Sequence, residues 1–158
     1  MSFTQEVFAR LAQRGLALPA SMPKPAGLYD AFRLREGLGF LAAQVPGYGA
    51  GSLPGRVGHE LRIDEGRAAA ALAALNALGR LHEALAGFDR LEGLLHVAGH
   101  VASADDFWDQ PEVLDGASEL FNFALGARGR HTRTAFAVPR LPKNISVELE
   151  INFGYRTK

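Results

Sequence analysis

Near the C-terminal end of the chain, two stretches alternate apolar and polar side chains on either side of a proline-containing turn. Residues 132–138 and residues 145–151 both follow this period-two pattern, which predicts two β-strands. If the strands fold back about Arg140 and Leu141 as a hairpin, Arg133 lies opposite Glu148, and directly opposed residues share a face of the sheet. We therefore expect a hairpin with one apolar face and one face that carries Arg133, Glu148 and small side chains, forming the floor of a pocket. The alternative is that Arg133 and Glu148 form only a cross-strand salt bridge that stabilises the hairpin.

Three segments show the spacing of apolar side chains that predicts amphipathic helices. They are residues 3–15, residues 65–86, which Asp64 can cap and Gly87 ends, and residues 111–125, which begin at Pro111 and end at Gly126. In the second of these helices the predicted apolar stripe consists of leucines, namely Leu72, Leu75, Leu78, Leu81 and Leu85. Residues 17–27 hold three prolines and are predicted to form a connector.

Shorter apolar runs predict the remaining strands. Residues 28–35 and 38–44 flank Glu36-Gly37, a two-residue turn signal, and form a second predicted hairpin. Residues 56–63 and 93–102 are predicted as single strands. The glycine-rich stretch 46–55 lacks the Lys-Ser/Thr ending of a phosphate-binding loop, so we interpret it as a flexible loop.

This order of elements predicts an α+β fold in which two long helices cover one face of a mixed sheet. The other face is partly apolar and needs burial, for which a symmetric oligomer is the usual solution. A chain of 158 residues is long enough for one domain with a sizeable core. We therefore expect one compact domain that assembles with copies of itself.

Composition excludes several kinds of partner and chemistry. The 17 basic and 17 acidic residues balance, so no overall charge favours nucleic acid or an anionic membrane. The absence of cysteine excludes disulfides, thiolate metal sites and cysteine nucleophiles. No uninterrupted apolar stretch is long enough for a signal peptide or a membrane span, and we expect a soluble, cytoplasmic protein.

Two histidines, His96 and His100, have the spacing of metal ligands on a helix. Val97, Gly99 and Val101 instead favour a strand, which would place the two imidazoles ~13 Å apart along the chain. At that separation they cannot share one ion, so we predict no metal site.

Several motifs of the chain occur together in one known family. The run from Arg133 to Glu150 has a Leu-Pro pair between Arg133 and Glu148. It is accompanied by the stretch Ala26-Gly27-Leu28-Tyr29, the strand that ends at Gln44, and the stretch Gly116-Ala117-Ser118-Glu119-Leu120. Together these motifs resemble the RidA/YjgF family of reactive intermediate deaminases, whose members are also called endoribonuclease L-PSP-like proteins. The resemblance runs from about residue 25 to 153 and predicts a family domain over 25–158. The N-terminal helix and connector over 1–24 lie outside it and indicate a divergent branch of the family.

The resemblance has implications for the fold, the oligomeric state and the site. It implies a chorismate-mutase-like fold and a homotrimer with clefts between subunits. In the deaminase members the arginine binds the carboxylate of a small 2-imino or 2-aminoacrylate-like acid, and the glutamate positions water. By this resemblance Arg133, Tyr29 and Gln44 are ligand-binding residues, Glu148 is the catalytic residue, and no cofactor is required.

The chain also departs from the family pattern. Ala42 stands where deaminase members have a serine, and we align Pro111 and Leu114 with a family asparagine and tyrosine. Hydrolysis of enamines or imines is therefore one expected function, and a non-catalytic trimer that binds small carboxylates is a second. A third, RNA cleavage or translation inhibition as described for some relatives, has only the basic loop from Arg128 to Arg140 in its favour.

Overall fold

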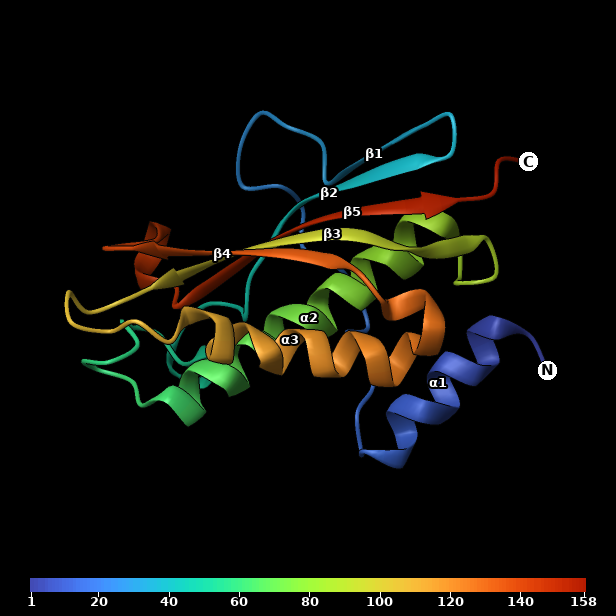
Figure 1. Ribbon diagram of the computed structural model, residues 1–158. Coiled ribbons are helices and arrows are strands. Elements are labelled where there is room, and N and C mark those ends of the chain that lie inside the picture. Colours follow the sequence, from blue (N-terminus) through green and yellow to red (C-terminus); the bar gives the residue numbers. More distant parts are fainter.

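The computed structural model describes residues 1–158 as two layers, a five-stranded mixed sheet above a layer of helices (Figure 1). The strands β1 (Phe32–Arg35), β2 (Leu38–Gln44), β3 (Leu91–Ala102), β4 (Thr132–Val138) and β5 (Val147–Tyr155) have the spatial order β1-β2-β5-β3-β4. Helices α2 (Ile63–Leu85) and α3 (Gln110–Leu125) lie under one face of the sheet, and α1 (Phe3–Gln13) lies beside α3. The predicted fold class is confirmed.

The core lies between the sheet and the helices, because every second strand residue faces α2 and α3. On β5 these residues are Val147, Leu149, Ile151 and Phe153, all fully buried. Helix α1 adds Val7 and Leu11 to the same core. The predicted turn at Glu36-Gly37 is confirmed, since both residues have the positive φ that a two-residue hairpin turn requires (49° and 85°).

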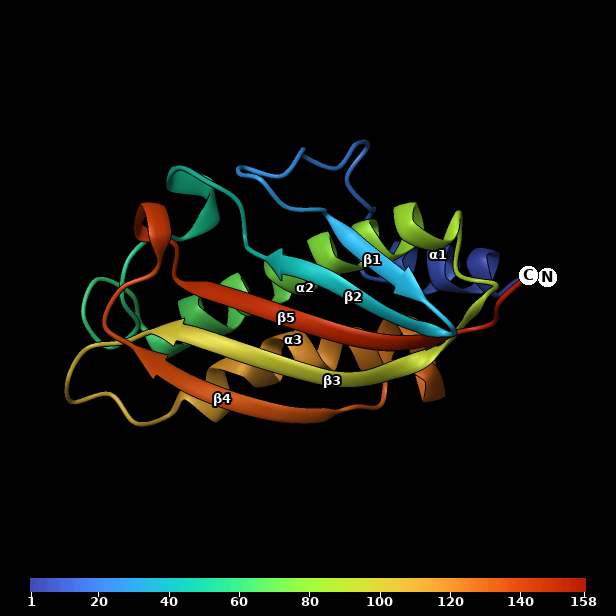
Figure 2. The same ribbon diagram turned by 90° about the horizontal axis from the view of Figure 1, so that it is seen from above.

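The C-terminal hairpin predicted from alternation is wrong. Strand β4 pairs in parallel with β3, and β3 pairs on its other side with β5, so a whole strand separates the two segments (Figure 2). The link from residue 139 to 146 is long enough to cross the end of β3. It makes this crossing through the short 3-10 turn Pro142–Asn144, where Asn144 accepts a hydrogen bond from the amide of Gly55 (3.0 Å).

The segment 56–63 is also not a strand, because only isolated bridges form at Val57 and Leu61. Helix α2 begins at Ile63, so Asp64 lies inside its first turn and not at its cap. The amide of Arg62 instead donates to the carboxylate of Glu65 (2.8 Å). These differences shift the start of α2 but leave its length close to the prediction.

The predicted leucine stripe of α2 is confirmed at Leu78, Leu81 and Leu85, and alanines make up most of the rest of the buried face. Five alanines are completely buried, namely Ala69, Ala70, Ala73, Ala74 and Ala77, whereas Leu72 and Leu75 are only partly buried. Small side chains allow α2 and α3 to approach closely. At Gly116 of α3, a Cβ atom would lie 2.2 Å from the carbonyl oxygen of Arg67 in α2, so this contact excludes any side chain.

The face of the sheet away from the helices carries no covering element (Figure 2). Three large apolar side chains on this face are exposed, Leu38, Phe40 and Phe136, with exposed fractions of 49%, 46% and 44%. Leu38 and Phe40 lie on β2 and Phe136 lies on β4, with β5 and β3 between them, so they are spread over the uncovered face.

None of the helices is both long and apolar enough to cross a membrane.

We predict that Gly116→Ala destabilises the protein. The added Cβ must push apart the backbones of two packed helices, and overpacking of this kind costs about 1–3 kcal/mol. Chemical denaturation measures the loss. Gly51→Ala is the matched control, because a Cβ there has no atom within 4 Å. Equal losses for the two variants would contradict the close helix contact.

Candidate functional site

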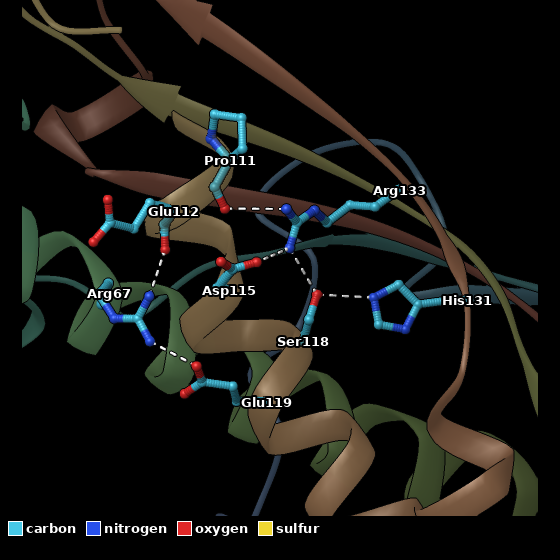
Figure 3. A network of polar contacts seen from close by, with 8 residues as sticks. All are labelled: Arg67, Pro111, Glu112, Asp115, Ser118, Glu119, His131 and Arg133. Carbon is cyan, nitrogen blue, oxygen red and sulfur yellow. Dashed lines mark hydrogen bonds and ion pairs between the residues drawn. The ribbon is translucent and has the colours of Figure 1, made fainter. Parts of the chain in front are cut away.

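Arg133 lies on β4, level with Val97 of β3, and its side chain crosses to α3 on the helical face of the sheet (Figure 3). Its Nη1 donates to Asp115 Oδ1 (2.8 Å) and Ser118 Oγ (3.0 Å), and its Nη2 donates to the carbonyl oxygen of Pro111 (3.0 Å). A guanidinium has five N–H groups, and those of Nε and one of Nη2 have no partner in the chain. Two free N–H groups on a fixed guanidinium can bind a carboxylate.

His131 lies just before β4 and faces the same part of α3. Its Nδ1 is 2.6 Å from the carbonyl oxygen of Gly129, which can only accept, so Nδ1 carries the ring proton. In the neutral ring Nε2 is then an acceptor, and Ser118 Oγ donates to it at 2.9 Å. Burial lowers the pKa of His131, and the positive charge of Arg133 lowers it further despite the opposing hydrogen bond to Gly129. The ring is therefore neutral at pH 7.

These side chains line a pocket of about 390 Å³ at the edge of the sheet. Its lining residues are Ser118, Asn122, Arg130, His131 and Arg133. None of them is hydrophobic, and two carry guanidinium groups. A pocket of this composition suits a small, polar, negatively charged molecule.

Glu148 does not lie in this pocket. It is level with His100 of β3 and faces the uncovered side of the sheet, opposite to the side that Arg133 faces. Phe136 of β4 stacks on His100 in the same row, with ring centroids 4.9 Å apart. Burial raises the pKa of Glu148, Glu150 raises it further, and His100 partly opposes this rise.

Tyr29 and Gln44 lie together at the other edge of the sheet, near β1 and β2. Both line a cavity of about 330 Å³ that the proline-rich connector, Ala42 and the buried Arg80 also border. The Tyr29 hydroxyl accepts a hydrogen bond from the amide of Ala26 (3.2 Å), and Gln44 Nε2 donates to the carbonyl oxygen of Ala42 (2.7 Å). The chain thus brings Tyr29 and Gln44 together and keeps both away from Arg133.

Two positions that depart from the family pattern also have defined places. Pro111 contributes its carbonyl oxygen to Arg133, and Leu114 is fully buried, where it fills the space above Gly99. Sequence reasoning did not identify Ser118, Asp115 or His131 as site residues. Ser118 lies within a motif of the family resemblance and His131 within the basic loop, but their pairing depends on how β4 lies against α3.

Comparison with known proteins identifies the family. A family model described as "YjgF/chorismate mutase-like, putative endoribonuclease" matches residues 8–153. The chain belongs to the YjgF family. Its fold is accordingly the chorismate-mutase-like fold expected from the sequence motifs.

Proteins from distant organisms resemble the chain along nearly its whole length. Protein TCP17 of Trypanosoma cruzi is 32% identical over 146 residues, which cover 91% of each chain. The structure of Atu1372 from Agrobacterium tumefaciens has a TM-score of 0.88 at 29% identity and covers 98% of this chain and 95% of its own. A protein from Shewanella oneidensis described as a "putative endoribonuclease" has a TM-score of 0.87 at 29% identity, with 94% and 98% covered.

The raised pKa of Glu148 predicts that its charge reduces stability. Because the folded-state pKa lies above the unfolded one, the folded state binds protons more tightly, and stability falls as pH rises through the folded pKa. Glu148→Gln removes the charge and should raise the melting temperature at pH 7. At about pH 4, below the folded pKa, the difference from wild type should shrink or vanish.

Thermal denaturation at both pH values measures this effect. Glu92→Gln is the control, because Glu92 is an exposed residue of β3 and its carboxylate makes no hydrogen bond. A Glu148→Gln protein less stable than wild type at pH 7 would contradict the assignment of an unfavourable, partly buried charge.

Proposed function

We propose that this YjgF family member binds small 2-imino and 2-oxo acids through Arg133 and hydrolyses reactive enamines and imines, such as 2-aminoacrylate, to 2-oxo acids. The observation that carries this proposal is the Arg133 guanidinium, which three hydrogen bonds fix to α3 while two N–H groups stay free. It lines a wholly polar pocket together with Arg130. Fixed donors hold a carboxylate without losing side-chain freedom on binding.

The proposed reaction needs few groups. An enamine first takes a proton at carbon from solvent and becomes the imine. Water then adds to the C=N carbon and one of its protons passes to nitrogen, which gives a carbinolamine. The second proton of the added water passes to nitrogen as the C–N bond breaks, so ammonia leaves and the 2-oxo acid remains. Arg133 holds the carboxylate next to the reacting carbon, and Glu148 orients the water. Positioning and one acid-base group are sufficient for such a step.

The complete site in this proposal lies between copies of the chain. Arg133 is at the β4 edge, Tyr29 and Gln44 are at the β1 and β2 edge, and Glu148 faces the uncovered side of the sheet. One chain cannot bring these groups together. A homotrimer that buries Leu38, Phe40 and Phe136 would place the Arg133 edge of one copy against the Tyr29 edge of the next.

A binding protein without catalysis is the second candidate, and one observation favours it. Ala42 lines the cavity beside Tyr29 and Gln44 but supplies no hydroxyl. TdcF from Escherichia coli, which shares this fold at 17% identity and a TM-score of 0.59 over 86% of this chain and 94% of its own, is described with bound serine. A small molecule with a carboxylate fits either candidate. RNA cleavage is not proposed, because the charges of the chain balance.

The deaminase proposal predicts faster loss of imine in a semicarbazide competition assay. With 2-iminobutanoate or 2-aminoacrylate generated in situ, wild-type protein should speed formation of the 2-oxo acid. Arg133→Ala should lower kcat/KM about 10²–10³-fold, because it removes the charged partner of the carboxylate. Arg140→Ala is the matched control, since the exposed Arg140 side chain lies outside the pocket.

The binding candidate gives a different combination of results. Small 2-oxo acids would then raise the melting temperature of wild type and of Arg140→Ala but not of Arg133→Ala, while imine loss stays at the uncatalysed rate. Equal thermal shifts for Arg133→Ala and wild type would reject Arg133 as the carboxylate anchor.

The shared site predicts that two inactive variants complement one another. Arg133→Ala and Glu148→Gln should each be inactive alone. If both groups of one site come from different copies, random assembly of the two variants in equal amounts leaves about one site in four with both native side chains. Co-expressed mixed oligomers should therefore regain about a quarter of wild-type activity. Activity that never exceeds the single variants would place both groups in one copy.

A further inference from the structure

The contacts of Ser118 fit a role that the imine reaction does not use. Its Oγ donates a hydrogen bond to His131 Nε2 (2.9 Å; Figure 3). The carbonyl oxygen of Gly129 accepts from Nδ1 of the same ring (2.6 Å). A serine hydroxyl, a neutral imidazole that can take its proton, and a third group that orients the ring are the parts of an activated nucleophile. The backbone carbonyl here stands in the place that a carboxylate takes in many serine hydrolases.

The surroundings of Ser118 also favour negative charge on its oxygen. Arg133 Nη1 donates to the same Oγ at 3.0 Å, and Arg130 lines the same pocket. A guanidinium next to a reacting oxygen stabilises both the developing alkoxide and the oxyanion of a tetrahedral intermediate. Ser118 borders an open pocket of about 390 Å³, so a small molecule can reach it.

We propose that Ser118 is a nucleophile, with His131 as its general base, that takes acyl groups from small polar or anionic esters. Oγ attacks the ester carbonyl carbon while its proton passes to His131 Nε2, and the guanidinium of Arg133 holds the oxyanion. The bond from carbon to the leaving oxygen then breaks, and that oxygen takes the proton from His131. Water repeats the sequence at the acyl-serine and releases the acid.

A purely structural role for these contacts, joining β4 to α3, makes a different prediction. Structural hydrogen bonds would stabilise the fold but give Ser118 no special reactivity. The reactivity of residue 118, and its dependence on His131, therefore distinguish a nucleophile from a structural contact. Neither depends on Glu148, on a second copy of the chain or on imine hydrolysis.

The cysteine-free sequence allows a direct test of His131 as a base. Ser118→Cys introduces the only thiol, and a neighbouring imidazole that takes its proton makes it reactive at low pH. At pH 6 it should react with iodoacetamide at least about tenfold faster than the exposed thiol of Ser21→Cys. Adding His131→Gln should remove this excess. Equal rates at the two positions in folded protein would overturn the proposal.

The native residue is tested with p-nitrophenyl acetate. Wild type should release p-nitrophenol faster than Ser118→Ala, and acid-quenched protein should carry one acetyl group on the peptide that contains Ser118. His131→Gln should lower the rate about 10²–10⁴-fold. Acetylation of Ser118 no faster than that of Ser21, or a rate unaffected by His131→Gln, would reject the nucleophile. Wild-type protein that is acetylated at Ser118 but inactive on imines would leave this inference standing and reject only the deaminase.

Discussion

An arginine on the helical face of a sheet needs polar partners, because that face is otherwise apolar. Arg133 meets this requirement through a carboxylate, a hydroxyl and a backbone carbonyl on successive parts of α3. Pairing with β3 places β4 at the edge of the sheet, and these three contacts join it to α3. His131, which directly precedes β4, lies within hydrogen-bond distance of Ser118 on the same helix. Arg133 thus connects the strand and the helix whose side chains line the edge pocket.

Local features of the fold were predictable because local residues determine them. The three helices follow from apolar spacing, the β1–β2 turn from Glu36-Gly37, and β3 from a run that is too rich in valine and glycine for a helix. The position of β4 was not predictable in the same way. A period-two pattern predicts that a segment is a strand and which of its residues share a face. It does not predict which strand lies beside it. The link 139–146 fits a hairpin as well as a crossing over β3.

The wrong pairing of β4 also gave a wrong prediction of how Arg133 and Glu148 lie relative to one another. In a hairpin the two would be directly opposed and share a face. With β3 between them, Arg133 is level with Val97 and Ile151, whereas Glu148 is level with His100 and Phe136. The roles predicted for Arg133, Glu148, Tyr29 and Gln44 rest on the family resemblance. The strand register of the structure was needed to show on which face or edge of the sheet each of them lies. The hydrogen bond from Ser118 to His131 could be recognised only from the structure, because it depends on the register of β4 and on the ring tautomer that the contact with Gly129 sets.

The alanine-lined face of α2 has a further consequence for how this family member can change over evolution. Alanine side chains have no rotamers, so packing them costs no side-chain entropy, but they also leave no freedom to adjust. Ala73 and Ala77 are completely buried, so a larger residue at either position would overpack the core. Sequence change is therefore expected to accumulate at the sheet edges and on the helix faces turned away from the core, while the alanines between the two helices and the sheet stay small. The side chains that line the two pockets can then change without loss of the helix packing.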